Sequence, residues 1–177
     1  MQLENGAVDE IVDAVERCPT GALHYERADG MQEQVRATNT VFVARNGPYY
    51  VRGDLELVLP DGSVTQETRA ALCRCGASNS KPFCDNAHRE IHFRDAGLHE
   101  TETSAQNELP TLQKLRITLN VNGNIKLEGA FELRDAMGQM IARGEREGLC
   151  RCGGSGNKPF CDNTHKRIGF KTVVSEQ

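Results

Sequence analysis

Short apolar runs separated by turn residues dominate the chain from residue 40 onward. Asn-Gly pairs at 46–47 and 122–123 each stand between two such runs, and this arrangement is a strong signal for a β-hairpin. The strands predicted from the pattern are Thr40–Ala44, Tyr49–Arg52, Leu55–Leu57, Leu115–Val121, Ile125–Leu127 and Phe131–Leu133, with short return strands at Ile91–Phe93 and Ile168–Phe170. Most of the chain should therefore be β-structure.

The N-terminal segment has a different periodicity. Val8, Ile11, Val12 and Val15 recur at helical spacing with acidic residues between them, which predicts a short helix over Val8–Arg17. Cys18-Pro19-Thr20-Gly21 follows directly and should end it. Together the two patterns predict an α+β, β-dominated fold preceded by a short N-terminal helix.

An internal duplication organises the rest of the chain. Residues 72–93 (LCRCGASNSKPFCDNAHREIHF) and 149–170 (LCRCGGSGNKPFCDNTHKRIGF) are identical at 15 of 22 positions, at a constant offset of 77. Such self-similarity indicates two copies of one structural unit. We expect an N-terminal segment at 1–37, a first unit at 38–96, a polar linker at 97–111 and a second unit at 112–173.

Composition and charge narrow the function classes. Apolar residues make up 38% of the chain and aromatic residues only 5%, which leaves little apolar surface for two small cores and makes a metal staple plausible. The net charge is −4 and no long basic run occurs, so a nucleic-acid binder is not expected. No basic start with an apolar run and no membrane-spanning stretch is visible, so we expect a soluble, cytoplasmic protein without a membrane partner.

The cysteines point to metal rather than to disulfides. Their number is odd, and apart from Cys18 they form two triplets with the same internal spacing. Clustered cysteines in a reducing compartment more often hold metal than each other. A histidine follows the third cysteine of each triplet by four residues, which places both on one side of a helical turn. The candidate metal ligands are Cys73, Cys75, Cys84 and His88 in the first copy, and Cys150, Cys152, Cys161 and His165 in the second.

Three cysteines and one histidine suit either a structural zinc ion or an iron–sulfur cluster. Zinc sites usually separate paired ligands by two to four residues, whereas one residue separates Cys73 from Cys75. A two-iron cluster offers one iron to each pair of ligands. The spacing therefore favours iron and sulfide, and zinc remains the alternative.

The pattern C-x-C-x2-S-x3-P-x-C-D-x2-H, present twice, resembles the signature of the CDGSH iron–sulfur domain family. Asn86 and Asn163 stand where that family usually has Gly, and Ala87 and Thr164 near its usual Ser. The resemblance covers roughly residues 38–173. It implies two [2Fe–2S] clusters, with the first two cysteines of each copy on an inner iron and the third cysteine and the histidine on an outer one. It also implies short helical turns at both clusters and a pseudo-twofold arrangement, in which one chain forms an internal counterpart of the homodimers made by single-motif relatives such as mitoNEET.

Cys18-Pro19 resembles the last ligand segment of ferredoxins, and the region looks like the remnant of a divergent [4Fe–4S] mono-cluster domain. No cysteine precedes it in this chain, so Cys18 is expected to be an orphan rather than a ligand. The other histidines, His24, His92 and His99, have no cysteine partner at motif spacing and are expected in surface or packing roles.

Three function classes follow from these residues. The first is electron transfer, redox sensing or cluster transfer, with a redox partner or a cluster-accepting protein. The second is a zinc-stabilised interaction module, and the third is a cluster-bearing subunit of an oxidoreductase. No nucleotide-binding glycine motif and no nucleophile with a recognisable base occur, so an enzyme acting alone is not expected.

A histidine ligand makes the predicted clusters sensitive to acid, because a proton competes with iron for the imidazole lone pair. Visible absorbance should decay faster as the pH falls, and His88→Cys and His165→Cys should slow that decay. Equal decay rates in the wild type and both variants would contradict histidine ligation.

Overall fold

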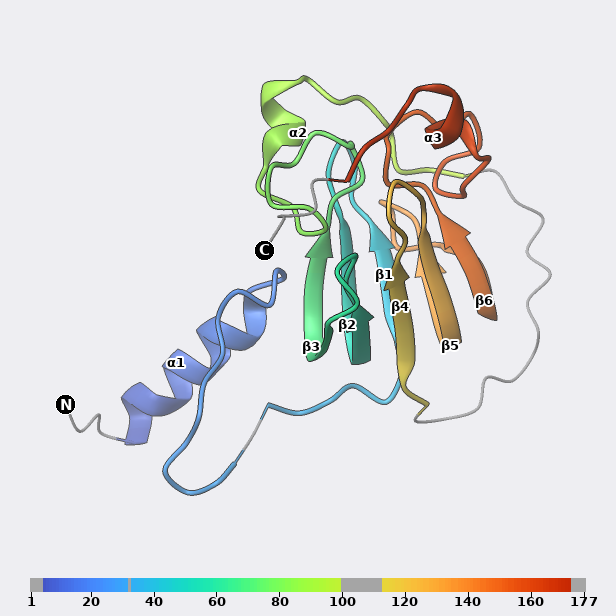
Figure 1. Cartoon of the computed structure of the whole chain (residues 1–177). Helices are drawn as coiled ribbons and strands as arrows, with labels where there is room; N and C mark the ends of the chain where they lie inside the picture. The colour runs from blue at the N-terminus through green and yellow to red at the C-terminus, as the bar shows by residue number, and fades with distance from the viewer. Residues whose placement is uncertain (1–4, 32, 100–112, 173–177) are drawn as a thin grey trace.

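The computed structural model describes residues 5–31, 33–99 and 113–172 (Figure 1). It confirms a strand-dominated fold with a short N-terminal helix and two tandem repeats. The elements are α1 (Asn5–Arg17), β1 (Thr40–Val43), β2 (Tyr49–Val58), β3 (Val64–Leu72), α2 (Ala87–Glu90), β4 (Leu115–Leu119), β5 (Ile125–Arg134), β6 (Met140–Leu149) and α3 (Thr164–Arg167).

All six strands belong to one sheet. In the first repeat β2 pairs with β3 in antiparallel register, and in the second β5 pairs with β6 in the same way. Both hairpins contain a bulge, after Arg52 in one and after Glu128 in the other, next to Gly53 and Gly129. A bulge bends a strand and increases its twist, so equivalent glycines curve the two long strands at equivalent places.

The first strand of each repeat joins the two repeats. β1 pairs antiparallel with β2 of its own repeat and parallel with β5 of the other. β4 likewise pairs antiparallel with β5 and parallel with β2. β1 and β4 therefore both lie between the two long strands, one at each end of them, and this arrangement is the pseudo-twofold relation that the sequence predicts.

The core lies on one face of this sheet. Along β2 buried and partly exposed residues alternate without interruption, as expected for a strand with one covered face. The buried cluster draws on all six strands: Val41, Val43, Tyr49, Val51, Leu55, Leu57, Ala70, Leu72, Leu115, Ile117, Leu119, Ile125, Leu127, Phe131, Leu133, Ile141 and Leu149. Burying each large aliphatic side chain contributes about 1.5–3 kcal/mol, so packing between the repeats adds to the stability of both.

Asn39, directly before β1, fixes the joint between the repeats. Its buried carboxamide donates hydrogen bonds to Gln113 O (2.7 Å) and Ala130 O (2.8 Å), and its Oδ1 accepts one from Asp54 N (2.9 Å). A Cβ atom on Gly53 would lie 2.1 Å from Asn39 Oδ1. Glycine at position 53 thus leaves the space that the Asn39 side chain occupies.

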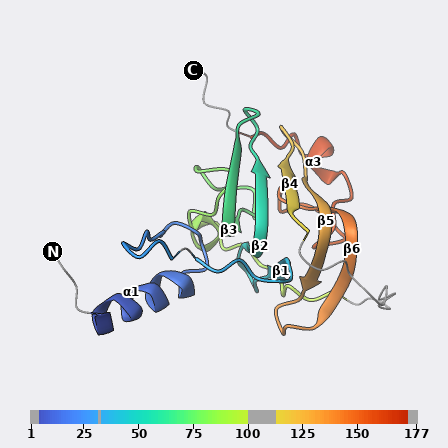
Figure 2. The ribbon, with the colours of Figure 1, turned by 90° about the horizontal axis from the view of Figure 1, so that it is seen from below.

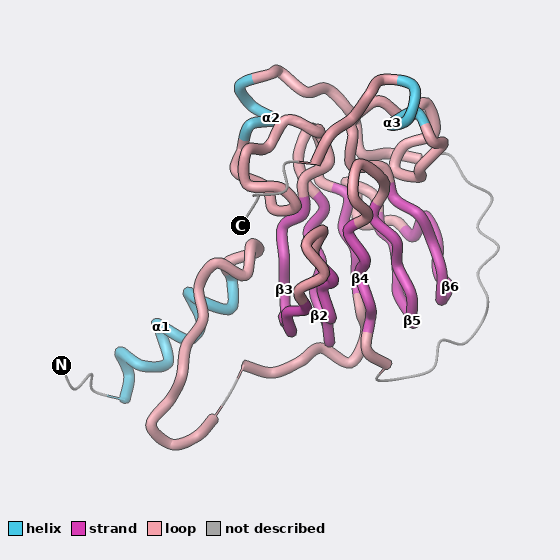
Figure 3. The backbone as a smooth tube through the Cα atoms, viewed as in Figure 1, coloured by secondary structure: helices cyan, strands magenta, loops and turns pink. Residues whose placement is uncertain are grey.

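The two cysteine-rich segments lie above the same end of the sheet. β3 ends at Leu72 and β6 ends at Leu149, and each leads directly into its cysteine motif. Figure 3 shows the resulting loops, with α2 and α3, gathered beyond the same ends of the strands. The fold therefore brings together two sites that are 77 residues apart in the sequence.

The structure differs from the sequence predictions in three respects. The return strands at Ile91–Phe93 and Ile168–Phe170 are wrong, because Phe93 N and Phe170 N donate to His88 O and His165 O and so close the ends of the helical turns. β3 and β6 were not predicted, and the short strands expected near residues 49–57 and 125–133 are parts of single long strands. The short helical turns at both motifs are confirmed.

The N-terminal segment packs along β3, outside the sheet (Figure 2). Arg69 of β3 donates to Leu23 O at 2.6 Å and forms an ion pair with Glu33. Gly21 approaches the strand so closely that a Cβ atom there would lie 2.1 Å from Arg69 O. α1, which begins three residues earlier than predicted, is therefore followed by a segment attached to the first repeat.

Most of the predicted linker lies outside the described residues. Of the predicted linker 97–111, only residues 97–99 are described. They pack on the second repeat, where Ala136 N donates to Gly97 O and the His99 ring meets the Phe160 ring edge-on at 4.9 Å. Among the described residues, no helix has the length and apolar character needed to cross a membrane.

Asn39→Ala should lower the free energy of unfolding by about 3 kcal/mol, because it leaves buried backbone groups of both repeats without partners. Denaturant unfolding of the two proteins measures the difference. Asn157→Ala, at an exposed position, is the control and should change stability by less than about 0.5 kcal/mol. Equal effects of the two substitutions would contradict the role given to Asn39.

Candidate metal centre

Each candidate site is a loop closed on the strand that precedes it. Cys73 N donates to Pro82 O at 2.8 Å, and Cys84 N donates to Ala71 O at 2.9 Å. Leu72 and Phe83 form a β-bridge between the two arms of the loop. The same bonds recur in the second copy, from Cys150 N to Pro159 O and from Cys161 N to Gly148 O. Backbone pairing thus brings the third cysteine back beside the first two.

The four candidate ligands of each copy form two pairs. Cys73 Sγ lies 3.8 Å from Cys75 Sγ, and Cys84 Sγ lies 3.4 Å from His88 Nδ1. In the second copy the distances are 3.7 Å between the Sγ atoms of Cys150 and Cys152, and 3.4 Å from Cys161 Sγ to His165 Nδ1. The structure thus repeats the same paired arrangement in both copies.

These distances suit one metal atom per pair. Two thiolates bound tetrahedrally at about 2.3 Å lie about 3.8 Å apart, and a thiolate and an imidazole somewhat less. In the part of the chain that the structure describes, no three Cys, His, Asp or Glu side chains are grouped around a position for a single metal ion.

Burial differs between the two pairs. Cys73 and Cys150 are buried, while Cys75, Cys84, Cys152 and Cys161 are partly exposed. His88 and His165 are 9% and 7% exposed, and the residues that follow them on α2 and α3 are exposed. The first cysteine of each copy is therefore the most buried of its three thiols. We call the two-cysteine pairs inner and the cysteine–histidine pairs outer.

Backbone amides point at the outer sulfur atoms. Asn86 N lies 3.5 Å from Cys84 Sγ, and Asn163 N lies 3.4 Å from Cys161 Sγ. Both asparagines have left-handed backbone conformations, with φ of 71° and 65°, which Asn adopts more readily than most residues. Asp85 and Asp162 accept from the amides two residues later, Ala87 N and Thr164 N, and so begin the helical turns.

A hydrogen bond links the two cysteines of the inner pair in each copy. A hydrogen bond with Cys75, together with the amides of Ser78 and Gly76, lowers the pKa of Cys73 to about 6, while the pKa of Cys75 is raised by the same bond and by burial. Cys150, with its pKa lowered to about 6, and Cys152 behave in the same way. A metal that binds both sulfur atoms must displace the remaining proton.

Loop side chains hold the turn between the second and third cysteines. Ser78 Oγ donates to Phe83 O at 2.7 Å, and Lys81 Nζ donates to Ser78 O at 2.5 Å. Ser155 and Lys158 make the same two bonds at the same distances. Ser78 and Ser155 therefore act on nearby backbone, as a turn residue does, and Lys81 has a structural role in the loop.

Arg74 and Arg151, each located between the two inner cysteines, are buried rather than solvated, at 1% exposure. Arg74 donates to Gly47 O (2.9 Å) and Ala44 O (2.7 Å), and Arg151 donates to Gly123 O (3.0 Å) and Asn120 O (2.7 Å). Their guanidinium groups lie over the rings of Phe93 and Phe170. Each arginine thus attaches a hairpin turn to its site.

The two buried arginines differ in charge balance. Arg74 forms an ion pair with Asp95. The equivalent of Asp95 in the second copy is Thr172, whose Oγ1 accepts from Arg151 Nη2 at 2.7 Å, and Arg151 Nη1 has no hydrogen-bond partner among the described residues. Among the described residues, the second site therefore has a buried cation without a carboxylate partner, which the identical motifs did not predict.

The two sites touch across the pseudo-twofold axis. Cys75 and Cys152 form an antiparallel β-bridge, and a Cβ atom on Gly76 would lie 2.6 Å from Cys152 O. Tyr49 of the first repeat, fully buried, lies with its Oη 2.8 Å from Cys150 O of the second. Nothing in the sequence indicates this contact of Tyr49, whose counterpart is Ile125, because an aromatic residue in a strand gives no signal of such a bond.

Cys18, His24 and His99 are not members of these ligand pairs, whereas His92 lines the same cavity as His88. Cys18 Sγ lies 3.1 Å from Thr20 Oγ1, and no metal-ligand group among the described residues includes it. The segment after it nevertheless approaches the first site, since Thr20, Gly21 and Ala22 line a cavity of about 320 Å³ together with Cys84. His24 lies 3.7 Å from Glu67, and His99 packs on Phe160.

Asp95→Ala should lower the free energy of unfolding by about 3 kcal/mol, because it leaves the buried Arg74 cation without its counter-ion. The matched control is Thr172→Ala, which removes only hydroxyl hydrogen bonds and should cost about 1 kcal/mol. Denaturant unfolding measures both. Similar small losses in the two variants would contradict the charge difference between the sites.

Comparison with known proteins agrees with this geometry. The profile of the iron-binding zinc finger of CDGSH type matches residues 46–89 and again residues 122–166, and the two matches span half of the chain. No match was found among curated proteins. Both matches contain a complete set of paired thiol and imidazole groups, and the chain belongs to the iron-binding CDGSH-type family, whose domain it carries twice.

Proposed function

We propose that the chain binds two [2Fe–2S] clusters and serves in electron or cluster transfer. Cys73, Cys75, Cys84 and His88 would hold the first cluster, and Cys150, Cys152, Cys161 and His165 the second. The observation that carries the proposal is the repeated division of four ligands into a thiol pair and a thiol–imidazole pair. When bound, such a cluster accepts and releases single electrons.

The protein groups around each site suit a negatively charged cofactor. The amides of Asn86 and Asn163 point at the outer sulfur atoms, and the amide of Ala77 lies 3.5 Å from Cys75 Sγ. Hydrogen bonds to cluster sulfur are among the factors that set a reduction potential. A neutral imidazole in place of a fourth thiolate lowers the negative charge of the site, which favours acceptance of an electron.

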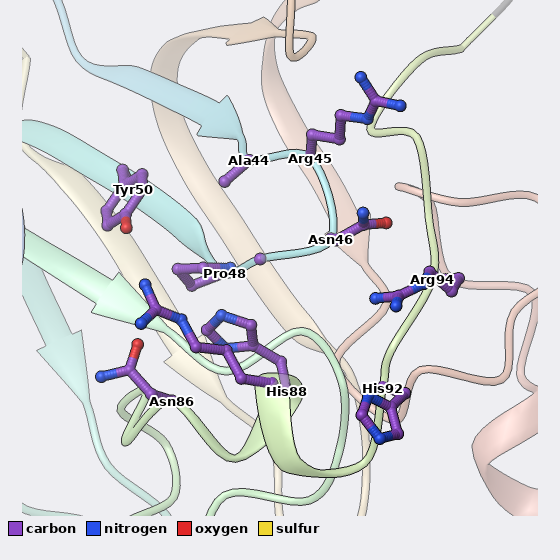
Figure 4. Close-up of a pocket in the computed structure, with 11 residues that line it drawn as sticks. Ala44, Arg45, Asn46, Pro48, Tyr50, Asn86, His88, His92 and Arg94 are labelled. Atoms are coloured by element: carbon purple, nitrogen blue, oxygen red, sulfur yellow. The ribbon is translucent and has the colours of Figure 1, made fainter.

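Access to the sites supports transfer rather than a purely structural role. Cys73 is buried, whereas Cys84 lines the cavity beside the N-terminal segment and His88 lines a second cavity of about 410 Å³ (Figure 4). A partner would thus approach the outer ligands, and the inner thiols would retain their protein surroundings. Structural metal sites, in contrast, are usually closed.

Zinc remains the chemical alternative, and the absorbance of the purified protein discriminates between the two. Each of Cys84→Ser and Cys161→Ser should reduce the visible absorbance to about half, and the double variant should be colourless, because each substitution removes a ligand from one cluster. Anaerobic purification followed by absorption and circular dichroism spectroscopy measures this.

Cys18→Ser is the matched control for these variants and should leave the spectrum unchanged, since Cys18 lies apart from both ligand groups. A colourless wild-type protein, or loss of colour in Cys18→Ser comparable to that in Cys84→Ser, would contradict the proposed ligand sets.

A further inference from the structure

The cavity beside His88 lies between the β1–β2 turn and the α2 segment. Residues 44–48 form one side, and Asn86, His88, Arg89, His92 and Arg94 form the other, with Tyr50 also in the lining. Its volume of about 410 Å³ lies within the range of small-molecule sites, which is about 300–1,000 Å³. We name it the arginine pocket, after Arg45, Arg89 and Arg94.

The charge of this pocket differs from that of the chain as a whole. Three arginines line it and no Asp or Glu does, although the net charge of the chain is −4. Among the described residues none of the three forms an ion pair, whereas Arg27, Arg69, Arg74 and Arg134 all do. The three guanidinium groups therefore retain most of their hydrogen-bonding capacity.

The lining residues come from two segments that face each other, and in Figure 4 the Arg45 side chain extends away from His88 and His92. In Figure 4 Arg94 extends into the space between Asn46 and His92, while the His88 ring lies beside Pro48 and Tyr50 stands on the opposite side. Arg45, Arg89, His92 and Arg94 are exposed, so their donors are available from solvent, while His88 is buried behind them. An anion in the pocket would lie next to His88.

Positive charge continues past Tyr50. This residue also lines a neighbouring hollow of about 260 Å³, together with Arg36 and Arg52. A concave surface lined by one sign of charge attracts oppositely charged ligands. The field around the pocket thus favours an anion with more than one charge.

We propose that the arginine pocket binds a small phosphate-bearing anion, either inorganic or esterified. The planar fork of arginine matches a phosphate group with two parallel hydrogen bonds, and such charge-assisted bonds are stronger than neutral ones. The concave shape and small volume favour a small ligand over the acidic face of a protein. The site and its occupant go beyond the proposed cluster function, and neither depends on which metal the cysteines hold.

The second repeat lacks this combination. Its counterparts of Arg45, Arg89 and Arg94 are Val121, Lys166 and Lys171, and Gly169 replaces His92. Lysine has the positive charge but not the planar guanidinium group with its parallel N–H donors, and valine has neither. The duplicated chain therefore has one anion site, beside the first of its two metal centres.

Calorimetric titration of the full chain with pyrophosphate tests the proposal directly. One binding event per chain is expected, and Arg89→Gln with Arg94→Gln should weaken it at least about tenfold, because charge-assisted bonds are lost. Arg45→Val, which introduces the residue of the second repeat, should weaken it by a smaller factor. Arg89→Lys should bind better than Arg89→Gln, since the charge is kept.

Lys166→Gln with Lys171→Gln is the matched control in the second repeat and should leave pyrophosphate affinity unchanged. Titrations with ADP and with inorganic phosphate distinguish a phosphate ester from an inorganic phosphate as the ligand. Tighter binding of ADP identifies an ester, and tighter binding of pyrophosphate identifies an inorganic anion. A glutamate-rich peptide that binds more tightly than every phosphate compound would overturn the proposal in favour of a protein partner.

Failure of all three phosphate compounds to bind at millimolar concentration, or equal losses in the control and in the arginine variants, would also overturn it. Heat of binding is measured without reference to colour. A protein that failed to bind pyrophosphate would therefore leave the iron–sulfur proposal unaffected. A colourless protein that bound pyrophosphate would contradict the iron–sulfur proposal and support the arginine pocket.

Discussion

The rest of the structure depends on the hydrogen bonds that β1 and β4 each form with both long strands, β2 of the first repeat and β5 of the second. Each of these short strands pairs with β2 along one edge and with β5 along the other edge. The last strands, β3 and β6, then end on the same side, and both cysteine motifs begin there. Neither repeat could place its site in this way without strands of the other.

This constraint also explains the contact between the two sites. The loops that follow β3 and β6 meet where Cys75 and Cys152 pair, and only glycine fits at positions 76 and 153, each with a positive φ. Two centres in contact through backbone share their surroundings, as the bond from Tyr49 to Cys150 O shows. Arg151 of the second site accordingly interacts electrostatically with Cys73 of the first.

The features that could be predicted from the sequence are those set by residue types a few positions apart. The repeated motif predicted that Cys84 and His88 lie on one side of a helical turn, because this follows from their spacing. The two-unit, strand-dominated fold followed from the same repeat and from the Asn-Gly turns. These features depend on neighbours within a few residues.

Sequence reasoning failed where distant contacts decide the structure. β3 (VTQETRAAL) and β6 (MIARGEREGL) are rich in polar and charged residues, so their strand character comes from pairing with β2 and β5. Phe93 and Phe170 were expected in strands, but each packs under a buried arginine. Burial of Arg74 itself depends on Asp95 and on the turn at Gly47, and no local pattern reveals that arrangement.

The measurement that tests the account most directly is the content of iron, zinc and acid-labile sulfide in anaerobically purified protein. The account predicts about four iron atoms and about four sulfides per chain, two of each for every site, with little zinc. A protein that contains zinc in place of iron, and no sulfide, would contradict it.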